Sequence, residues 1–244
     1  MVILHGLFGA GRNWGAIARK LAERCKIYLV DLPNHGDSPW VKDLTYESMA
    51  ASVADFLRAR GIHGTACLLG HSMGGKTAMT LALSDPAALQ SLIVVDIVPV
   101  PYRGHQNAEI IDALAALPLD RLKSRVEIDA ALAPSIPDAM LRSYLLANLR
   151  RDEDGFGWRI NLAGLKTSLP ALHGFPTFAA GTQFDGPTLV IEGGRSDYIR
   201  AEDRPVMRGL FPQARFETLP DAGHWVHADA PDAVSALITK FISA

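Results

Sequence analysis

The sequence predicts an α/β fold, with a mostly parallel sheet of about six strands, helices on both faces and an inserted helical cap. Short apolar segments alternate with amphipathic helical segments in residues 1–100 and again in residues 186–244. In residues 101–185 the apolar residues recur mainly with helical spacing. We therefore expect a core domain formed by residues 1–100 and 186–244, with residues 101–185 inserted as a cap. Alternatively, the inserted helices pack on the sheet like the others.

The predicted strands of the core are six short apolar segments, at residues 2–4, 27–30, 66–69, 92–95, 188–191 and 215–219. Each is followed by a loop that is rich in glycine, proline or polar residues. Because crossovers between parallel strands are right-handed, these loops should meet at one edge of the sheet. That edge is where we expect the functional residues.

The predicted helices are bounded by residues that favour helix ends. Asn13 and Thr45 are suitable N-cap residues, while Gly61 and Pro86 end two helices. The core helices are expected at residues 13–23, 45–60, 76–83, 202–210 and 231–242. The cap is expected to contain helices at 108–117, 119–132 and 137–149, a turn at 151–155 and an extended piece at 156–160.

Composition narrows the class of protein. The chain has 244 residues, of which 48% are hydrophobic and 20% charged, which is typical of a globular domain. Its net charge of −2 argues against a nucleic-acid or membrane surface, and the histidines show no metal-ligand spacing. No apolar run is long enough to span a bilayer. Cys25 and Cys67 are expected to be buried and unpaired, so we predict a soluble cytoplasmic protein.

The central motif is Gly70-His71-Ser72-Met73-Gly74, which lies between a predicted strand and a predicted helix. This G-x-S-x-G pattern is typical of a nucleophile elbow, a sharp turn that projects a serine hydroxyl. The glycines leave room for a strained backbone and its close neighbours. We predict that Ser72 is a nucleophile, and we expect His71 to pack rather than to catalyse.

Residues 70–77 also match G-x-x-x-x-G-K-[ST], the phosphate-binding loop of nucleotide hydrolases. Asp96, at the end of an apolar strand, would then bind magnesium. This alternative puts the phosphate loop after the third predicted strand rather than the first. It also gives no purpose to the histidines that follow the first and last strands. The surroundings of Ser72 therefore favour the hydrolase interpretation.

A serine hydrolase also needs a base, an acid that orients the base, and N–H donors for the oxyanion. In enzymes with this elbow the chain order is serine, acid, histidine. His224 follows the last predicted strand and is the candidate base. Asp96 and Asp197 both lie between Ser72 and His224 in loops at the expected edge, and the residues alone leave that choice open.

Five motifs resemble those of the α/β-hydrolase superfamily, and within it those of the small YbfF-like bacterial esterases. They are HGLFG at residues 5–9, DLPNHGDSP at 31–39, GHSMGGK at 70–76, VDIVP at 95–99 and GHWVHA at 223–228. The resemblance covers essentially the whole chain. It implies that short-chain acyl esters or thioesters are hydrolysed without a cofactor. It also implies that the backbone N–H groups of Leu7 and Met73 bind the oxyanion.

The resemblance bears on two further points. It favours Asp96 over Asp197 as the acid, with Ser196 as an auxiliary contact. Members of the superfamily usually carry two strands before the one that ends at His5, whereas this chain begins at that strand. We therefore expect the first two strands of the fold to be missing, or a natural start upstream of Met1.

Aromatic residues are candidates for lining an apolar acyl pocket under the cap. We single out Phe8, Tyr102, Trp158 and Trp225, and consider Phe156, Phe175 and Phe178 as further candidates. A short helical cap favours a small pocket and short acyl chains. The expected partner is a small ester or thioester, and the protein is expected to be a monomer or small homo-oligomer. Acyl transfer, C–C hydrolysis, perhydrolysis and ligand binding without catalysis stay open as alternatives.

Overall fold

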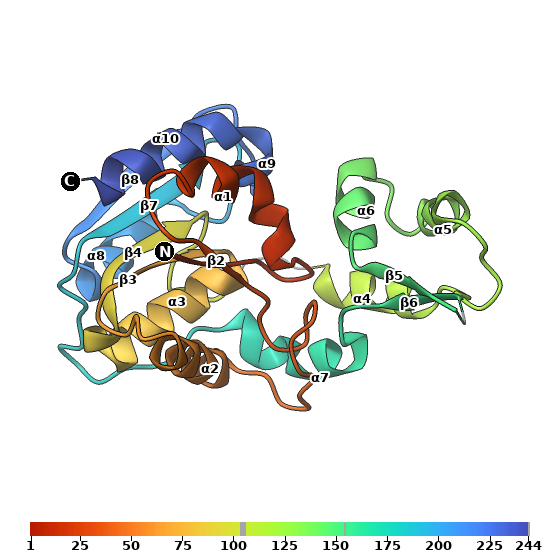
Figure 1. The fold of residues 1–244 in the computed structure, drawn as a ribbon, viewed down its shortest axis with the longest axis horizontal. Coiled ribbons are helices and arrows are strands. Elements are labelled where there is room, and N and C mark those ends of the chain that lie inside the picture. The colour runs from red at the N-terminus through yellow and green to blue at the C-terminus, as the bar shows by residue number, and fades with distance from the viewer. Residues whose placement is uncertain (103–105, 154, 244) are drawn as a thin grey trace.

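The computed structural model describes residues 1–102, 106–153 and 155–243. Its main sheet has six parallel strands in the order β2-β1-β3-β4-β7-β8 (Figure 1). These strands are β1 (Val2–Leu4), β2 (Tyr28–Val30), β3 (Ala66–His71), β4 (Leu89–Val95), β7 (Thr188–Gly193) and β8 (Ala214–Leu219). The number and direction of the strands confirm the predicted α/β sheet.

Each face of the sheet is covered by its own helices. Ile3 packs with residues of α1 and α10 on one face, whereas its neighbours Val2 and Leu4 pack with residues of α2, α3 and α8 on the other. The core helices are α1 (Gly15–Leu21), which follows a 3-10 turn (Gly11–Trp14), α2 (Tyr46–Ala59), α3 (Met73–Ser84), α8 (Arg204–Leu210), α9 (Val226–Asp229) and α10 (Pro231–Ile242). None of the described helices is both long and apolar enough to cross a membrane.

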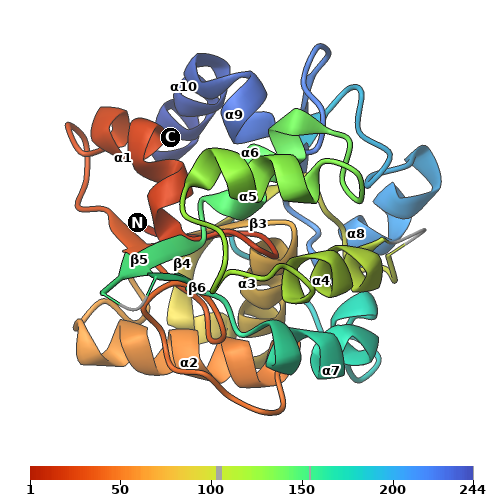
Figure 2. The ribbon, with the colours of Figure 1, turned by 90° about the vertical axis from the view of Figure 1, so that its right-hand side faces the viewer.

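The chain between β4 and β7 contains the elements predicted as the cap. They are α4 (Asn107–Ala115), α5 (Arg125–Leu132), α6 (Ala139–Leu146), the hairpin strands β5 (Leu149–Asp152) and β6 (Gly155–Trp158), and α7 (Leu162–His173). Figure 2 shows α4, α5 and α6 in front of the strands of the main sheet. The domain boundaries proposed for this segment stay predictions.

Two of the helices predicted in this segment are shorter than expected. The helix expected at 119–132 begins only at Arg125, because Ser124 is its N-cap and accepts a hydrogen bond from Glu127 N–H. The helix expected at 137–149 ends at Leu146, and the chain turns there into β5. Apolar residues with helical spacing continue beyond both boundaries, so the sequence pattern did not reveal where these helices begin and end.

Helix α7 was not among the predicted elements. It contains Gly164 and Pro170, two residues that weaken a helical pattern. The helix forms nevertheless, because Leu165, Leu169 and Leu172 bury one side of it in the core.

The two cysteines are free thiols, as expected. Both side chains are partly exposed rather than buried, so the prediction that they are buried is wrong in that respect. The surroundings of Cys67 nevertheless raise the pKa of its thiol to about 11, mainly through burial. A thiol with such a pKa is a poor nucleophile near neutral pH.

Candidate active site

The turn from β3 into α3 holds Ser72 in a strained backbone conformation. Ser72 has φ 52° and ψ −116°, outside the regions that L-residues favour. The flanking glycines are required, because a Cβ on Gly70 would lie 2.1 Å from Gly74 O, and one on Gly74 would lie 2.5 Å from His5 O. Ser72 N–H donates to Val95 O at 3.1 Å, at the end of β4. These contacts fix the serine at the carboxyl edge of the sheet.

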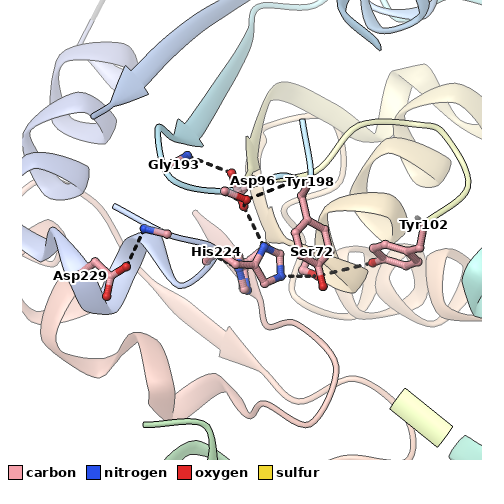
Figure 3. A network of polar contacts seen from close by, with 10 residues as sticks. Ser72, Asp96, Tyr102, Gly193, Tyr198, His224 and Asp229 are labelled. Atoms are coloured by element: carbon pink, nitrogen blue, oxygen red, sulfur yellow. Dashed lines mark hydrogen bonds and ion pairs between the residues drawn. The ribbon is translucent and has the colours of Figure 1, made fainter. Parts of the chain in front are cut away.

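Ser72, His224 and Asp96 are joined by two hydrogen bonds (Figure 3). Ser72 Oγ lies 3.1 Å from His224 Nε2, and His224 Nδ1 lies 2.8 Å from Asp96 Oδ2. With Nδ1–H donating to the carboxylate, Nε2 is free to accept the serine proton. The three residues follow β3, β8 and β4, so the topology brings together side chains that are far apart in the sequence.

The Asp96 carboxylate is completely buried, and three groups donate to it. Besides His224, these are Gly193 N–H at 2.9 Å from Oδ1 and the Ser196 hydroxyl at 2.5 Å from Oδ2. A buried charge without such partners would be costly. Asp96 itself has φ 51°, a second strained position in the site. The predicted contact between Ser196 and Asp96 is therefore present.

Asp197, the alternative acid, lies outside this network. It is exposed, and among the described residues it makes no hydrogen bond to His224. Its neighbour Tyr198 points toward the site instead. Burial, and then the nearby Asp197 carboxylate, raise the pKa of the Tyr198 phenol.

The loop that carries His224 is held from several sides. Gly223 N–H donates to Asp229 Oδ2 at 2.7 Å, and His71 Nε2–H donates to His224 O at 2.9 Å. The Tyr198 ring stacks on the His224 imidazole, with centroids 3.6 Å apart and planes 12° apart. Burial, and then the neighbouring histidines, lower the pKa of His71 far below its ordinary value. A neutral His71 ring thus supports the loop through the backbone.

Leu7 and Met73, the residues expected to bind an oxyanion, line the same cavity as Ser72. Met73 is the first residue of α3, so its N–H has no acceptor within the helix and lies at the positive end of the helix dipole. Leu7 belongs to the loop after β1, where His35 Nε2 accepts a hydrogen bond from Phe8 N–H at 3.2 Å. Both N–H groups are therefore candidates for the oxyanion site.

A cavity of about 560 Å³ opens at Ser72. This volume lies within the ordinary range for small-molecule sites, so the predicted size limit on the acyl chain stays a prediction. Three of the predicted pocket residues, Phe8, Tyr102 and Trp225, line it. Trp158 does not line it, because it lies on β6 opposite Leu149 and packs against apolar residues of the main core cluster. The further candidates that also lie outside this cavity are Phe156, Phe175 and Phe178.

Three tyrosines that line the cavity, Tyr46, Tyr144 and Tyr198, were not among the predicted site residues. Tyr198 carried a usable signal, because it lies in the loop after a strand that ends at the expected edge. Tyr46 and Tyr144 lie in α2 and α6, and their positions in those helices give no local indication of the site.

Lys76 argues against the phosphate-loop interpretation. Its side chain is completely buried, and Nζ donates to Gly174 O at 2.7 Å. Burial lowers its pKa to about 7. In a phosphate-binding loop this lysine has to reach a bound phosphate, which a side chain directed into the core cannot do. The match to the nucleotide-binding pattern is therefore coincidental.

Comparison with known proteins agrees with this geometry. The family model for the alpha/beta hydrolase fold matches residues 1–231. The chain is 40% identical to the sn-1-specific diacylglycerol lipase ABHD11 of Danio rerio, over 98% of this chain and 77% of that protein. It is 35% identical to esterase YbfF of Escherichia coli K12, over 100% of this chain and 92% of that protein.

A solved structure is also similar. The marine microorganism esterase superposes with a TM-score of 0.94 at 37% identity, covering 98% of this chain and 94% of that one. The chain thus matches the family model and is also similar, over nearly its whole length, to proteins named esterases or lipases. The chain therefore belongs to the α/β-hydrolase fold family and is a hydrolase of its esterase and lipase type.

Proposed function

We propose that the protein is a serine esterase that cleaves short-chain acyl esters or thioesters through an acyl-enzyme on Ser72. The observation that carries this proposal is the continuous pair of hydrogen bonds from Ser72 through His224 to the buried Asp96, at the mouth of a largely apolar cavity. Two of the relatives are named a diacylglycerol lipase and an esterase, which supports an ester as the substrate.

The proposed acylation begins when His224 Nε2 takes the Ser72 proton as Oγ attacks the acyl carbonyl. Asp96 keeps Nδ1 protonated and stabilises the imidazolium that forms. The backbone N–H groups of Leu7 and Met73 bind the oxyanion of the tetrahedral intermediate. The imidazolium then gives its proton to the departing alcohol or thiol, and the acyl group stays on Oγ.

Deacylation repeats these steps with water as the nucleophile. His224 takes a proton from water, the hydroxide attacks the acyl carbonyl, and a second oxyanion forms at the same N–H groups. The imidazolium then protonates Ser72 Oγ as the carboxylic acid leaves. Apart from the substrate and water, each group used in these steps is a side chain or backbone N–H of this site.

The direct test is turnover of 4-nitrophenyl acetate and butyrate, combined with labelling by a fluorophosphonate probe. We expect the wild type to hydrolyse both esters and to be labelled at Ser72. Ser72→Ala should lose both properties, whereas Ser52→Ala, on the exposed side of α2, should keep them. Turnover that survives in Ser72→Ala would refute the proposal.

The same assay separates the alternatives. Labelling of Ser72 without ester hydrolysis would indicate acyl transfer, C–C hydrolysis or perhydrolysis with the same residues. Absence of both labelling and turnover would favour a ligand-binding protein. The preference for short chains, the cytoplasmic location and the monomeric or small homo-oligomeric state stay predictions.

A further inference from the structure

The buried Lys76 connects the nucleophile helix to the end of α7. Its Nζ donates to Gly174 O at 2.7 Å and lies 3.4 Å from His173 O. The last carbonyls of a helix lack helical partners and carry partial negative charge, so a buried ammonium is favourable there. Lys76 thus joins α3, which begins directly after Ser72, to the inserted segment.

The same ammonium lies against an aromatic ring. Lys76 Nζ is 3.8 Å from the centroid of the Tyr102 ring, and Tyr102 N–H donates to His173 O at 2.8 Å. An ammonium has three N–H groups, and two carbonyls and one ring face can occupy them. In its protonated form, which a pKa of about 7 leaves partly populated at neutral pH, Lys76 attracts the electrons of the phenol and makes the Tyr102 hydroxyl a better hydrogen-bond donor.

The Tyr102 hydroxyl lies between two oxygen atoms. It is 3.4 Å from Ser72 Oγ, and the Tyr46 hydroxyl is a further polar neighbour. Tyr46 donates its own proton to Leu172 O at 2.7 Å, so its oxygen can only accept from Tyr102. The single Tyr102 proton can therefore be donated to Tyr46 Oη or to Ser72 Oγ. Figure 3 shows Tyr102 and His224 on opposite sides of Ser72.

We propose that Tyr102 is a catalytic hydrogen-bond donor to Ser72 Oγ, and that Lys76 and Tyr46 are positioning residues that hold it from the end of α7. This inference rests on the proposed esterase function. While Ser72 is neutral, its proton points to His224 and Tyr102 donates to Tyr46. When negative charge develops on Oγ during attack, and again when Oγ leaves the acyl carbon, the Tyr102 hydroxyl turns to Oγ.

The Tyr102 proton is shared in this step and is not transferred. Burial raises the pKa of the Tyr102 phenol, so it stays protonated throughout. Its oxygen reaches the nucleophile from the side that His224 leaves open. The role therefore differs from that of Leu7 and Met73, whose N–H groups are proposed to bind the carbonyl oxygen.

The test compares Tyr102→Phe, Lys76→Met and the double variant with the wild type. We expect Tyr102→Phe to lower both kcat and the rate of fluorophosphonate labelling about tenfold, while KM changes less than about twofold. Lys76→Met should lower both rates about fivefold. The double variant should be no slower than Tyr102→Phe alone, because Lys76 acts through the Tyr102 hydroxyl.

The matched controls remove a tyrosine hydroxyl and a lysine ammonium at positions outside the site. Tyr28→Phe on β2 and Lys166→Met on the exposed side of α7 should leave both rates unchanged. If Lys76→Met does not fold, Lys76→Gln replaces it, since an amide still donates to a carbonyl but carries no charge. Lys76→Gln should then also lower kcat and the labelling rate, and combining it with Tyr102→Phe should cause no further loss.

Two results would overturn the inference. One is Tyr102→Phe with kcat and labelling within twofold of the wild type. The other is a double variant whose loss is the product of the single losses, which indicates that Lys76 acts only on the packing of α7. Failure of the esterase proposal is recognised separately, because either Ser72→Ala would then keep its turnover or the wild type would show no ester hydrolysis.

Discussion

The cavity at Ser72 has two walls that hold their residues by different means. On the wall formed by the edge of the sheet, the backbone itself is fixed. Ser72 N–H donates to Val95 O at 3.1 Å, and Asp96 N–H donates to Ile191 O at 2.8 Å, so both residues continue the hydrogen bonding of the sheet. A residue held in this way cannot move without breaking the sheet.

The opposite wall, from the chain between β4 and β7, is attached mainly through side chains. Tyr144 Oη donates to Leu7 O at 3.1 Å, and Asn148 Nδ2 donates to Phe8 O at 2.6 Å. Its helices present apolar residues to the cavity without forming part of the main sheet. We therefore propose that the sheet fixes the reacting atoms, whereas the helices of the inserted segment select the substrate, apart from the donor role proposed for Tyr102. Substitutions on the two walls should therefore have effects of different kinds.

The largest effect is expected at Ser72, on the sheet wall. Ser72→Ala should lower kcat for 4-nitrophenyl butyrate by roughly 10⁶, because the nucleophile is removed. The fold should be retained, since the contacts of this hydroxyl in the described residues are hydrogen bonds with His224 and Tyr102 rather than packing contacts. Circular dichroism would check this. Residual activity above a few per cent would exclude Ser72 as the nucleophile.

The next effect distinguishes the two acids. Asp96→Asn should lower kcat by roughly 10⁴, because an amide no longer holds His224 in the required tautomer. Asp197→Asn is the matched control and should stay within about twofold, since that residue is exposed and lies outside the network. Steady-state kinetics of both variants decide the question. Reversed results would assign the acid to Asp197.

The folded protein should lose stability in acid, because neutral histidines are buried behind the sheet wall. Burial, and then the nearby His224, lower the pKa of His227 to about 4. Below pH 6.5 the unfolded chain binds a proton that the folded protein rejects, so stability falls as the pH drops toward 4. His227→Gln should reduce this slope by about 1.4 kcal/mol per pH unit. Urea unfolding at several pH values measures it, and an unchanged slope would show that His227 does not titrate in this way.

The smallest effect is expected on the wall from the inserted segment. The wild type should prefer acetyl to hexanoyl esters over longer ones, since each further methylene contributes about 0.8 kcal/mol only while there is room. Ile110→Trp narrows the cavity from α4, so kcat/KM for the hexanoyl ester should fall about fivefold relative to the acetyl ester. A wild-type optimum at dodecanoyl or longer would contradict the proposed chain length.

How much the residues alone could predict also differs between the two walls. Alternating apolar strands and the glycines around Ser72 were sufficient to predict the sheet, its functional edge and the meeting of Ser72 with His224. The residues could not choose between Asp96 and Asp197, because both follow strands at that edge. The choice depends on which carboxylate the backbone turns inward, and that is a tertiary property.

In the inserted segment the local signals were misleading. Pro170 and Gly164 concealed α7, whose stability comes from burial against the core. Trp158 was expected in the pocket because it is aromatic, yet it packs with other apolar residues away from the cavity. Which side chains line the cavity depends on contacts between segments far apart in the sequence, and periodicity carries no information about them.

The left-handed backbone at Ser72 and Asp96 has an evolutionary consequence. Each such position costs of order 1–3 kcal/mol in a residue with a side chain, and glycine largely removes that cost. A Ser72→Gly protein should therefore melt at a higher temperature than Ser72→Ala while being equally inactive. Selection for folding alone would favour the dead enzyme, so the serine persists in a lineage only while its chemistry is used. Laboratory evolution that selects for heat resistance without an activity assay should likewise favour glycine in place of Ser72.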